Sequence, residues 1–212
     1  MLVKHLMTPD PIPISPEKSV ADAVELMTQR GIRHLPVLDD GRLVGLVTRS
    51  SLAKALPGLG TGLTRFEYNY LTSSTQVKEV MIRDPVLGTE DMAAEEAARV
   101  MNAHRISSLI IMRDDRPVGI ITDTDIFEAM LELLGARRPG VRLTVHLEDR
   151  PGQLAKVAGA VGDAGGNISA VGGWFVDEGT WAAVLKIQNL PADQVTRIVG
   201  SVPGVTVVDV RE

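Results

Sequence analysis

The sequence predicts an α+β fold in two parts, a pseudo-symmetric duplicated module followed by a smaller βαββαβ unit. The first observation is an internal repeat. When the chain is shifted by 74 positions, residues 3–52 pair with residues 77–126 without a gap, and 14 of these 50 pairs are identical, whereas chance gives about three. The second observation is a change of pattern after residue 140, where alternating strands and a helical stretch follow one another.

Each copy of the repeat predicts the same elements in the same order. A short extended piece after an Asp-Pro turn comes first, and a helical stretch whose apolar residues recur at helical spacing follows. Two apolar runs follow, LPVL and LVGLVT in one copy and SLIIM and PVGIIT in the other, each pair joined by a polar turn that favours a hairpin. A second helix closes each copy. Units of under 60 residues bury little apolar area alone, so we expect the two copies to pack together. The apolar helix positions are Val20, Ala23, Val24 and Met27 in one copy and Ala94, Ala97, Ala98 and Met101 in the other.

The last seventy residues predict a ferredoxin-like arrangement. VRLTVHL alternates apolar and polar residues as a half-buried strand does. A helix with Leu154, Val157, Ala158 and Val161 on one face follows, and then the strands NISAVGGWFV and TWAAVLKI. A short helix from Pro191 and the strand VTVVDV complete the order βαββαβ.

Composition excludes several classes of function. The chain has no cysteine, which rules out disulfides, thiolate metal sites and thiol catalysis. A net charge of −5 without clustered lysine and arginine argues against nucleic acid as a partner. The N-terminus carries prolines where an export signal needs a continuous apolar stretch, and no segment is apolar enough to cross a membrane. We therefore expect a soluble cytoplasmic protein without a membrane partner.

The sequence offers no catalytic constellation. The four histidines form no metal-ligand pair, and neither a nucleophile motif nor a phosphate-loop lysine is present. We expect no catalytic residues, no metal site and no enzymatic activity.

The frame GIRHLPVLDDGRLVGLVTRSSL and its second copy RISSLIIMRDDRPVGIITDTDI resemble the CBS domain, a regulatory module that occurs in tandem pairs. The resemblance is specific because the whole order of elements recurs twice. It implies a first CBS domain over residues 1–58, a linker over 59–76 and a second CBS domain over 77–136.

The resemblance implies an adenosine nucleotide as ligand. Asp125 would accept both vicinal hydroxyls of the ribose, and Thr122 at the helix start would face the phosphate. Arg33 and His34 would approach the phosphates from the first copy. Thr48 marks the corresponding first-copy site, which is impaired because Ser51 stands where the acid would be. The residues implied to line an apolar slot for adenine are Val86, Leu87 and Gly88.

The same residues also fit a purely structural role. Thr-x-x-Asp before an apolar run is a variant of the capping box, in which Thr122 caps the helix and Asp125 returns the hydrogen bond. Arg33 and His34 fit a solvated pair beside a strand equally well. The two roles of Asp125 are compatible with each other.

The stretch DRPGQLAKVAGAVGDAGGNIS resembles the ACT domain, a small module that commonly binds an amino acid between two copies of itself. The resemblance covers residues 141–212. Gly152 would let the backbone approach an α-carboxylate, which free N–H groups at the helix start would receive. A tight loop without a ligand is the alternative. The residues implied to bind the amino acid are Asp149, Gly152, Gln153, Leu154, Asn167 and Ile168.

A CBS pair followed by an ACT domain resembles the acetoin-utilisation accessory protein family. This resemblance implies a non-catalytic cytoplasmic sensor with an adenosine nucleotide as regulatory ligand, AMP or ATP first and S-adenosylmethionine or NADH next. It further implies an amino acid as second ligand, a homodimer and a regulated protein partner. The alternative is an assembly scaffold with vestigial ligand sites.

Overall fold

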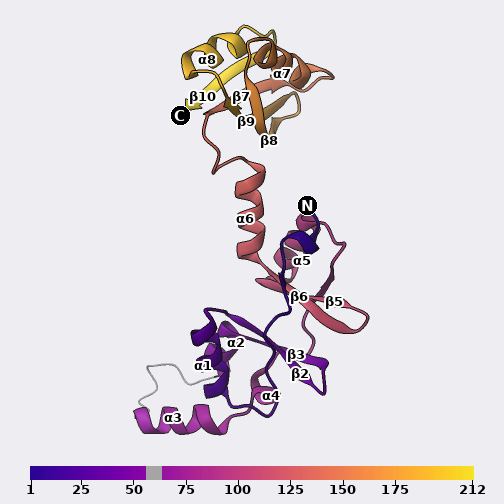
Figure 1. Ribbon diagram of the computed structural model, residues 1–212, viewed down its shortest axis with the longest axis vertical. Coiled ribbons are helices and arrows are strands. Elements are labelled where there is room, and N and C mark those ends of the chain that lie inside the picture. The colour runs from indigo at the N-terminus through magenta and orange to yellow at the C-terminus, as the bar shows by residue number, and fades with distance from the viewer. Residues whose placement is uncertain (56–63) are drawn as a thin grey trace. The chain divides into compact units, whose positions relative to one another are not determined.

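The computed structural model describes residues 1–55 and 64–212, which form two compact units, Met1–Ile126 and Phe127–Glu212 (Figure 1). The boundary expected at residues 58 and 59 lies outside the described residues. In the described part of the chain, no helix combines the length and the apolar character needed to cross a membrane. The mixed α+β class predicted from the sequence is confirmed.

The two sequence repeats fold alike, as predicted. In both first helices the same three positions are buried, Val20, Ala23 and Met27 in one and Ala94, Ala97 and Met101 in the other. The first repeat contains α1 (Val20–Arg30), β2 (His34–Asp39), β3 (Arg42–Thr48) and α2 (Arg49–Ala55), and the second contains α5 (Ala94–His104), β5 (Ser108–Arg113), β6 (Arg116–Thr122) and α6 (Asp123–Leu133). The connecting elements are η1 (Val3–His5), α3 (Arg65–Ser74) and α4 (Val77–Val80).

Each repeat completes its sheet with a segment from the other half of the unit. The short strand β1 (Thr8–Pro9) belongs to the first repeat but pairs with β6 of the second, where Thr8 lies opposite Ile120. The corresponding Ile82 belongs to the second repeat and bridges Leu46 of the first. In the second repeat, β4 (Leu87–Thr89) adds in parallel to β5 and completes the order β1-β6-β5-β4. The two repeats are therefore joined by exchanged segments.

Two repeated glycines make room for this exchange. A Cβ atom on Gly45 would lie 2.7 Å from the sulfur of Met81 and 2.9 Å from the carbonyl oxygen of Ile82. At the equivalent Gly119, a Cβ atom would collide with the side chain of Met7. Real Cβ atoms do not come this close to other atoms, so only glycine fits without a shift. The methionine of each exchanged segment thus rests on the glycine of the opposite repeat.

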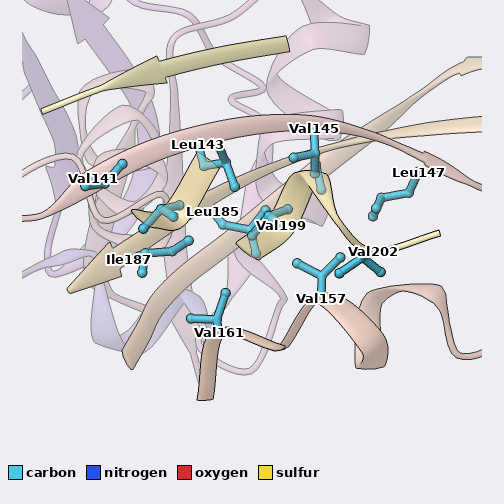
Figure 2. Packing of buried hydrophobic residues seen from close by; sticks show 12 residues of the cluster. Val141, Leu143, Val145, Leu147, Val157, Val161, Leu185, Ile187, Val199 and Val202 are labelled. Atoms are coloured by element: carbon cyan, nitrogen blue, oxygen red, sulfur yellow. The ribbon is translucent and has the colours of Figure 1, made fainter. Parts of the chain in front are cut away.

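The second unit has the predicted βαββαβ order, built from β7 (Val141–Glu148), α7 (Gln153–Asp163), β8 (Asn167–Asp177), β9 (Thr180–Gln188), α8 (Ala192–Gly200) and β10 (Val205–Arg211). Its antiparallel sheet has the order β10-β7-β9-β8, with β8 at an edge. Valines, leucines and isoleucines of β7 and β9 meet those of α7 and α8 in one core (Figure 2).

The buried face of α7 differs from the predicted one. Val157 and Val161 are buried as expected, but Leu154 is 37% exposed and Ala158 is also exposed. Gln153 takes the third buried position and is only 3% exposed. The helix buries one row of residues spaced four apart, 153, 157 and 161. This narrow row is enough to complete the core because residues of α8 pack against the same sheet.

Candidate functional site

A cavity of about 280 Å³ lies where the two repeats meet, and we call it the Asp125 cavity. The first repeat contributes residues 31–34, which lead from the end of α1 into β2. The second contributes Ile120 and Thr122 from β6 and Thr124 and Asp125 from the first turn of α6. The exchanged N-terminal segment forms a further wall with Thr8, Asp10, Pro11 and Ile12.

The carboxylate of Asp125 caps its own helix with one oxygen. Asp125 Oδ2 accepts hydrogen bonds from the N–H of Thr122 at 2.7 Å and from the hydroxyl of Thr122 at 2.8 Å. None of the described residues donates a hydrogen bond to the other oxygen, Oδ1. The carboxylate is held in place and retains an acceptor for a ligand, so the capping role and a ligand-binding role coexist in this geometry.

Arg33 and His34 reach across to the second repeat. The guanidinium of Arg33 donates to the hydroxyl of Thr124 at 3.1 Å and lies 3.7 Å from a carboxylate oxygen of Asp123. His34 Nε2 and the Ser107 hydroxyl are 3.2 Å apart. Burial, assisted by the positive charge of Arg33, lowers the pKa of His34, and Asp123 offsets part of this effect. His34 is therefore a neutral hydrogen-bonding group near pH 7.

A second cavity of about 460 Å³ is the repeat-related counterpart of the first, and we call it the Thr48 cavity. Shifting the twelve residues of the Asp125 cavity by 74 positions reproduces eleven of the twelve residues that line the Thr48 cavity. The twelfth counterpart, Ser51, is replaced in the lining by Lys54. The exchanged segment again contributes, here through Asp84, Pro85 and Val86. The internal repeat of the sequence is thus also a repeat of cavities.

The helix start beside the Thr48 cavity carries no carboxylate. The Ser51 hydroxyl donates to the carbonyl oxygen of Thr48 and accepts from the N–H of Thr48, both at 3.0 Å. The N–H of Ser51 donates in turn to the Thr48 hydroxyl at 3.0 Å. This closed set of bonds caps α2 without charge. With Ser51 in place of an acid, this helix start has no carboxylate to match that of Asp125.

The structure brings four of the predicted nucleotide-binding residues together and separates the other four. Thr122, Asp125, Arg33 and His34 all line the Asp125 cavity. The three residues predicted to form an adenine slot do not line this cavity, and neither does Thr48. Thr48 and Val86 line the Thr48 cavity, Leu87 lies in a separate hollow beside the hairpin turns, and Gly88 is buried beneath Ile111.

The apolar wall of the Asp125 cavity is instead formed by Pro11, Ile12 and Ile120. Ile12 is the repeat counterpart of Val86, so Val86 lines the Thr48 cavity and its counterpart lines the Asp125 cavity. The segment exchange causes this difference. The repeat alignment pairs the segments around residues 8–12 and 82–86, but it does not show that each segment packs against the other repeat.

The predicted amino-acid site occupies the loop before α7 and the start of β8. Gly152 has a left-handed backbone (φ 82°) and is exposed, as are Asp149 and Leu154. Asn167 donates to the side chain of Gln188 at 3.3 Å, and Ile168 packs against the core.

Gln153 does not present the free groups that the sequence predicts. Its N–H donates to the carbonyl oxygen of Arg150 at 3.3 Å. Its buried side-chain amide donates to the carbonyl oxygen of Pro203. Gln153 thus ties the start of α7 to the segment before β10.

Two family models match the chain. The CBS domain model matches residues 3–58 and 77–132, and the TTHA0829-like ACT domain model matches residues 139–211. The tandem pair and the C-terminal ACT-like domain expected from the sequence are thereby confirmed.

Curated relatives match over the duplicated part. The CBS domain-containing protein YhcV of Bacillus subtilis is 30% identical over 124 residues, which cover 58% of this chain and 81% of YhcV. An inosine-5'-monophosphate dehydrogenase of Korarchaeum cryptofilum is 32% identical over 119 residues, 56% of this chain and 22% of the enzyme. The chain spans a quarter or less of the length of the first curated relatives it matches.

Solved structures resemble the same region. The CBS domain pair of protein MJ0100, in complex with 5'-methylthioadenosine and S-adenosyl-L-methionine, has a TM-score of 0.51 at 29% identity, covering 61% of this chain and 99% of that one. A protein named for acetoin utilization (AcuB) from Vibrio cholerae has a TM-score of 0.53 at 30% identity, covering 65% and 95%. CBSX2 in complex with AMP has a TM-score of 0.50 at 26% identity, covering 65% and 98%.

Proposed function

Because this chain belongs to the CBS-domain family, we propose that it is a non-catalytic cytoplasmic sensor that binds an adenosine nucleotide or a related adenosine compound in its CBS pair. The Asp125 cavity is the proposed site. One observation carries the proposal: Asp125 is fixed by its cap and still has a carboxylate oxygen without a donor from the described residues. A fixed acceptor beside a cavity suits the hydroxyls of a ribose.

The surroundings of Asp125 support this function. Pro11, Ile12 and Ile120 provide apolar surface against which an adenine ring can pack, while Thr122 and His34 provide polar atoms. Solved CBS pairs similar to this one hold 5'-methylthioadenosine, S-adenosyl-L-methionine or AMP. These ligands share an adenosine group, and the ribose of that group is the part that Asp125 would grip.

Two further assignments belong to the same proposal. The sensor acts as a homodimer on a regulated protein partner, and its resemblance to AcuB of Vibrio cholerae favours a role in acetoin utilisation. The ACT-like domain binds an amino acid at the loop around Gly152, where the exposed left-handed glycine leaves the backbone accessible. With the Gln153 N–H engaged, the carboxylate of this ligand would depend on the remaining N–H groups of the loop.

An assembly scaffold with vestigial sites is the second candidate. The observation that favours it is the capping bond itself, because Asp125 already accepts the N–H and the hydroxyl of Thr122 at the helix start without any ligand. The closed Thr48–Ser51 arrangement points the same way.

Thermal melts separate the two candidates. A ligand at 100 times its Kd stabilises the folded state by about 2.7 kcal/mol, and a protein of this size gains about 2–4 °C per kcal/mol. We expect at least one of 5'-methylthioadenosine, S-adenosylmethionine, AMP, ATP and NADH to raise the Tm of the wild type by about 5–10 °C. In Asp125→Asn this shift disappears, while the melt without ligand stays close to that of the wild type because the amide oxygen of asparagine can accept the same two hydrogen bonds from Thr122.

Ser51→Ala is the matched control, since it alters the same position of the other repeat and leaves Asp125 intact. Its ligand-induced shift should equal that of the wild type. If none of the five compounds moves the melt, or if Asp125→Asn responds as the wild type does, the scaffold is the better description.

A further inference from the structure

The chain carries its sulfur only as thioethers, because it has eight methionines and no cysteine. Two of the eight, Met7 and Met81, occupy equivalent positions of the two repeats. Each stands on an exchanged segment, and its sulfur lies against a glycine of the opposite repeat, Met7 against Gly119 and Met81 against Gly45. These two methionine–glycine contacts hold the repeats together.

Both methionines are half-buried. Met7 packs against the core cluster of the second repeat, and Met81 packs against that of the first. A molecule as small as hydrogen peroxide can approach a residue that keeps part of its surface in solvent. The core methionines Met27 and Met101 are only 6% and 4% exposed and are shielded from such a reagent. Met7 and Met81 therefore combine access from solvent with a structural contact.

The Met81 contact leaves no space for an oxygen atom between the sulfur and the glycine. At Gly45 even a Cβ atom would lie 2.7 Å from the Met81 sulfur. The backbone groups beside it are already paired, because the N–H groups of Leu46 and Ile82 each donate to the other residue's carbonyl oxygen at 2.9 Å. A sulfoxide at Met81 must either bury its oxygen without these donors or leave the glycine, and both outcomes destabilise the contact.

We propose that Met7 and Met81 are sites of reversible oxidation by hydrogen peroxide and that this oxidation loosens the contact between the repeats. The sulfur lone pair attacks one peroxide oxygen, so an S–O bond forms and the O–O bond breaks. The thioether is oxidised by two electrons to a sulfoxide. The peroxide is reduced to water, because the departing hydroxide takes the proton of the transferred oxygen. A flexible apolar side chain thereby becomes a polar, chiral one.

Oxidation of these residues also disturbs the walls of both cavities. Met7 directly precedes Thr8, which lines the Asp125 cavity. Met81 directly precedes Ile82, which lines the Thr48 cavity. A sulfoxide that leaves its glycine displaces the segment that carries it. The duplicated unit thus responds to peroxide through the same two segments that shape its cavities, whatever the cavities hold.

Circular dichroism melts of the full chain after graded peroxide treatment test this role, with the oxidation of each methionine followed by peptide mass spectrometry. We expect the circular dichroism transition to fall by at least about 4 °C once Met7 and Met81 are oxidised. The tryptophan fluorescence transition should hold, because the second unit has a single methionine, Met130, which is 49% exposed. A mixture of the two methionine sulfoxide reductases, one for each sulfoxide epimer, should restore the first transition.

A double variant, Met7→Leu with Met81→Leu, removes both thioethers at nearly constant volume. It should melt close to the wild type before peroxide treatment and keep that melt afterwards. The matched control is Met92→Leu with Met112→Leu, which removes the other two half-buried methionines of the first unit and leaves both methionine–glycine contacts intact. This control should lose stability in peroxide as the wild type does.

Four results would overturn the proposed oxidation sites. The melt stays unchanged although Met7 and Met81 are oxidised, the loss is not reversed by the reductases, the Met7 and Met81 double variant loses as much as the wild type, or both residues stay reduced when Met130 is fully oxidised. If that double variant does not fold, the wild type decides. Its loss must then rise in step with sulfoxide at Met7 and Met81 and not with sulfoxide at Met92 and Met112.

Discussion

Gly45→Ala should destabilise the CBS pair, because the added methyl group has no space. It would lie 2.7 Å from the Met81 sulfur and 2.9 Å from the Ile82 carbonyl oxygen, where ordinary contacts are about 3.4–4 Å. The Met81 side chain can rotate away, but the backbone of Ile82 cannot. Ile82 is held to Leu46 by two hydrogen bonds of 2.9 Å, and retreat would stretch both. Overpacking of this kind costs about 1–3 kcal/mol.

The equivalent Gly119→Ala should cost less. There the nearest atoms all belong to the side chain of Met7, a flexible residue that can adapt. The predicted order of stability is wild type, then Gly119→Ala, then Gly45→Ala. At about 2–4 °C per kcal/mol, Gly45→Ala lowers the melting temperature by about 2–12 °C.

The two tryptophans of the chain allow the assay to distinguish its units. Trp174 and Trp181 both lie in the second unit, so tryptophan fluorescence follows the ACT-like domain while far-UV circular dichroism follows both units. In Gly45→Ala we expect an earlier transition in circular dichroism and an unchanged fluorescence transition. An unshifted circular dichroism melt, or a larger loss in Gly119→Ala than in Gly45→Ala, would refute the steric reasoning about the exchanged segments.

Three further predictions concern pH and the second unit. Burial lowers the pKa of His34, so the unfolded chain binds more protons than the folded one between that lowered value and the ordinary value of about 6.5. Stability should therefore fall as pH drops from 7.5 to 5.5, and His34→Gln should flatten this loss in urea midpoints measured at both pH values. In the ACT-like domain, Gly173→Ala should lower the fluorescence-detected melt, because a Cβ atom there collides with the Trp181 ring. Gly159 lies on α7, and a Cβ atom there meets no atom within 4 Å, so Gly159→Ala should raise the free energy of unfolding of this domain by about 0.5–1 kcal/mol.

The secondary structure could be predicted from the sequence because local patterns encode it. Val20, Ala23 and Met27 recur at helical spacing, and all three are buried on α1. The alternation in VRLTVHL likewise directs Leu143 and Val145 to the core of the second unit (Figure 2). Where burial follows from periodicity alone, the sequence suffices.

The composition of the Asp125 cavity could be predicted only in part. Thr122 and Asp125 lie on one helix start, and their proximity follows from their spacing. The opposite wall depends on whether the segment 8–12 packs against its own repeat or against the other one, and the sequence pattern is compatible with either arrangement. Pairing between distant strands is decided by packing, here by Met7 on Gly119, and local periodicity carries no record of that contact.

The contrast between VGLVTRSS and VGIITDTD follows from these contacts. The glycine of each copy must stay because a methionine from the other half of the unit rests on it, and the threonine must stay because its bonds begin the next helix. The residues after the threonine are less constrained, since the serine hydroxyl in α2 and the aspartate carboxylate in α6 both accept a hydrogen bond from the N–H of the threonine. Duplication thus gives two cavities lined by equivalent positions, and the positions just beyond the threonine carry opposite charge while the frame around them is held constant.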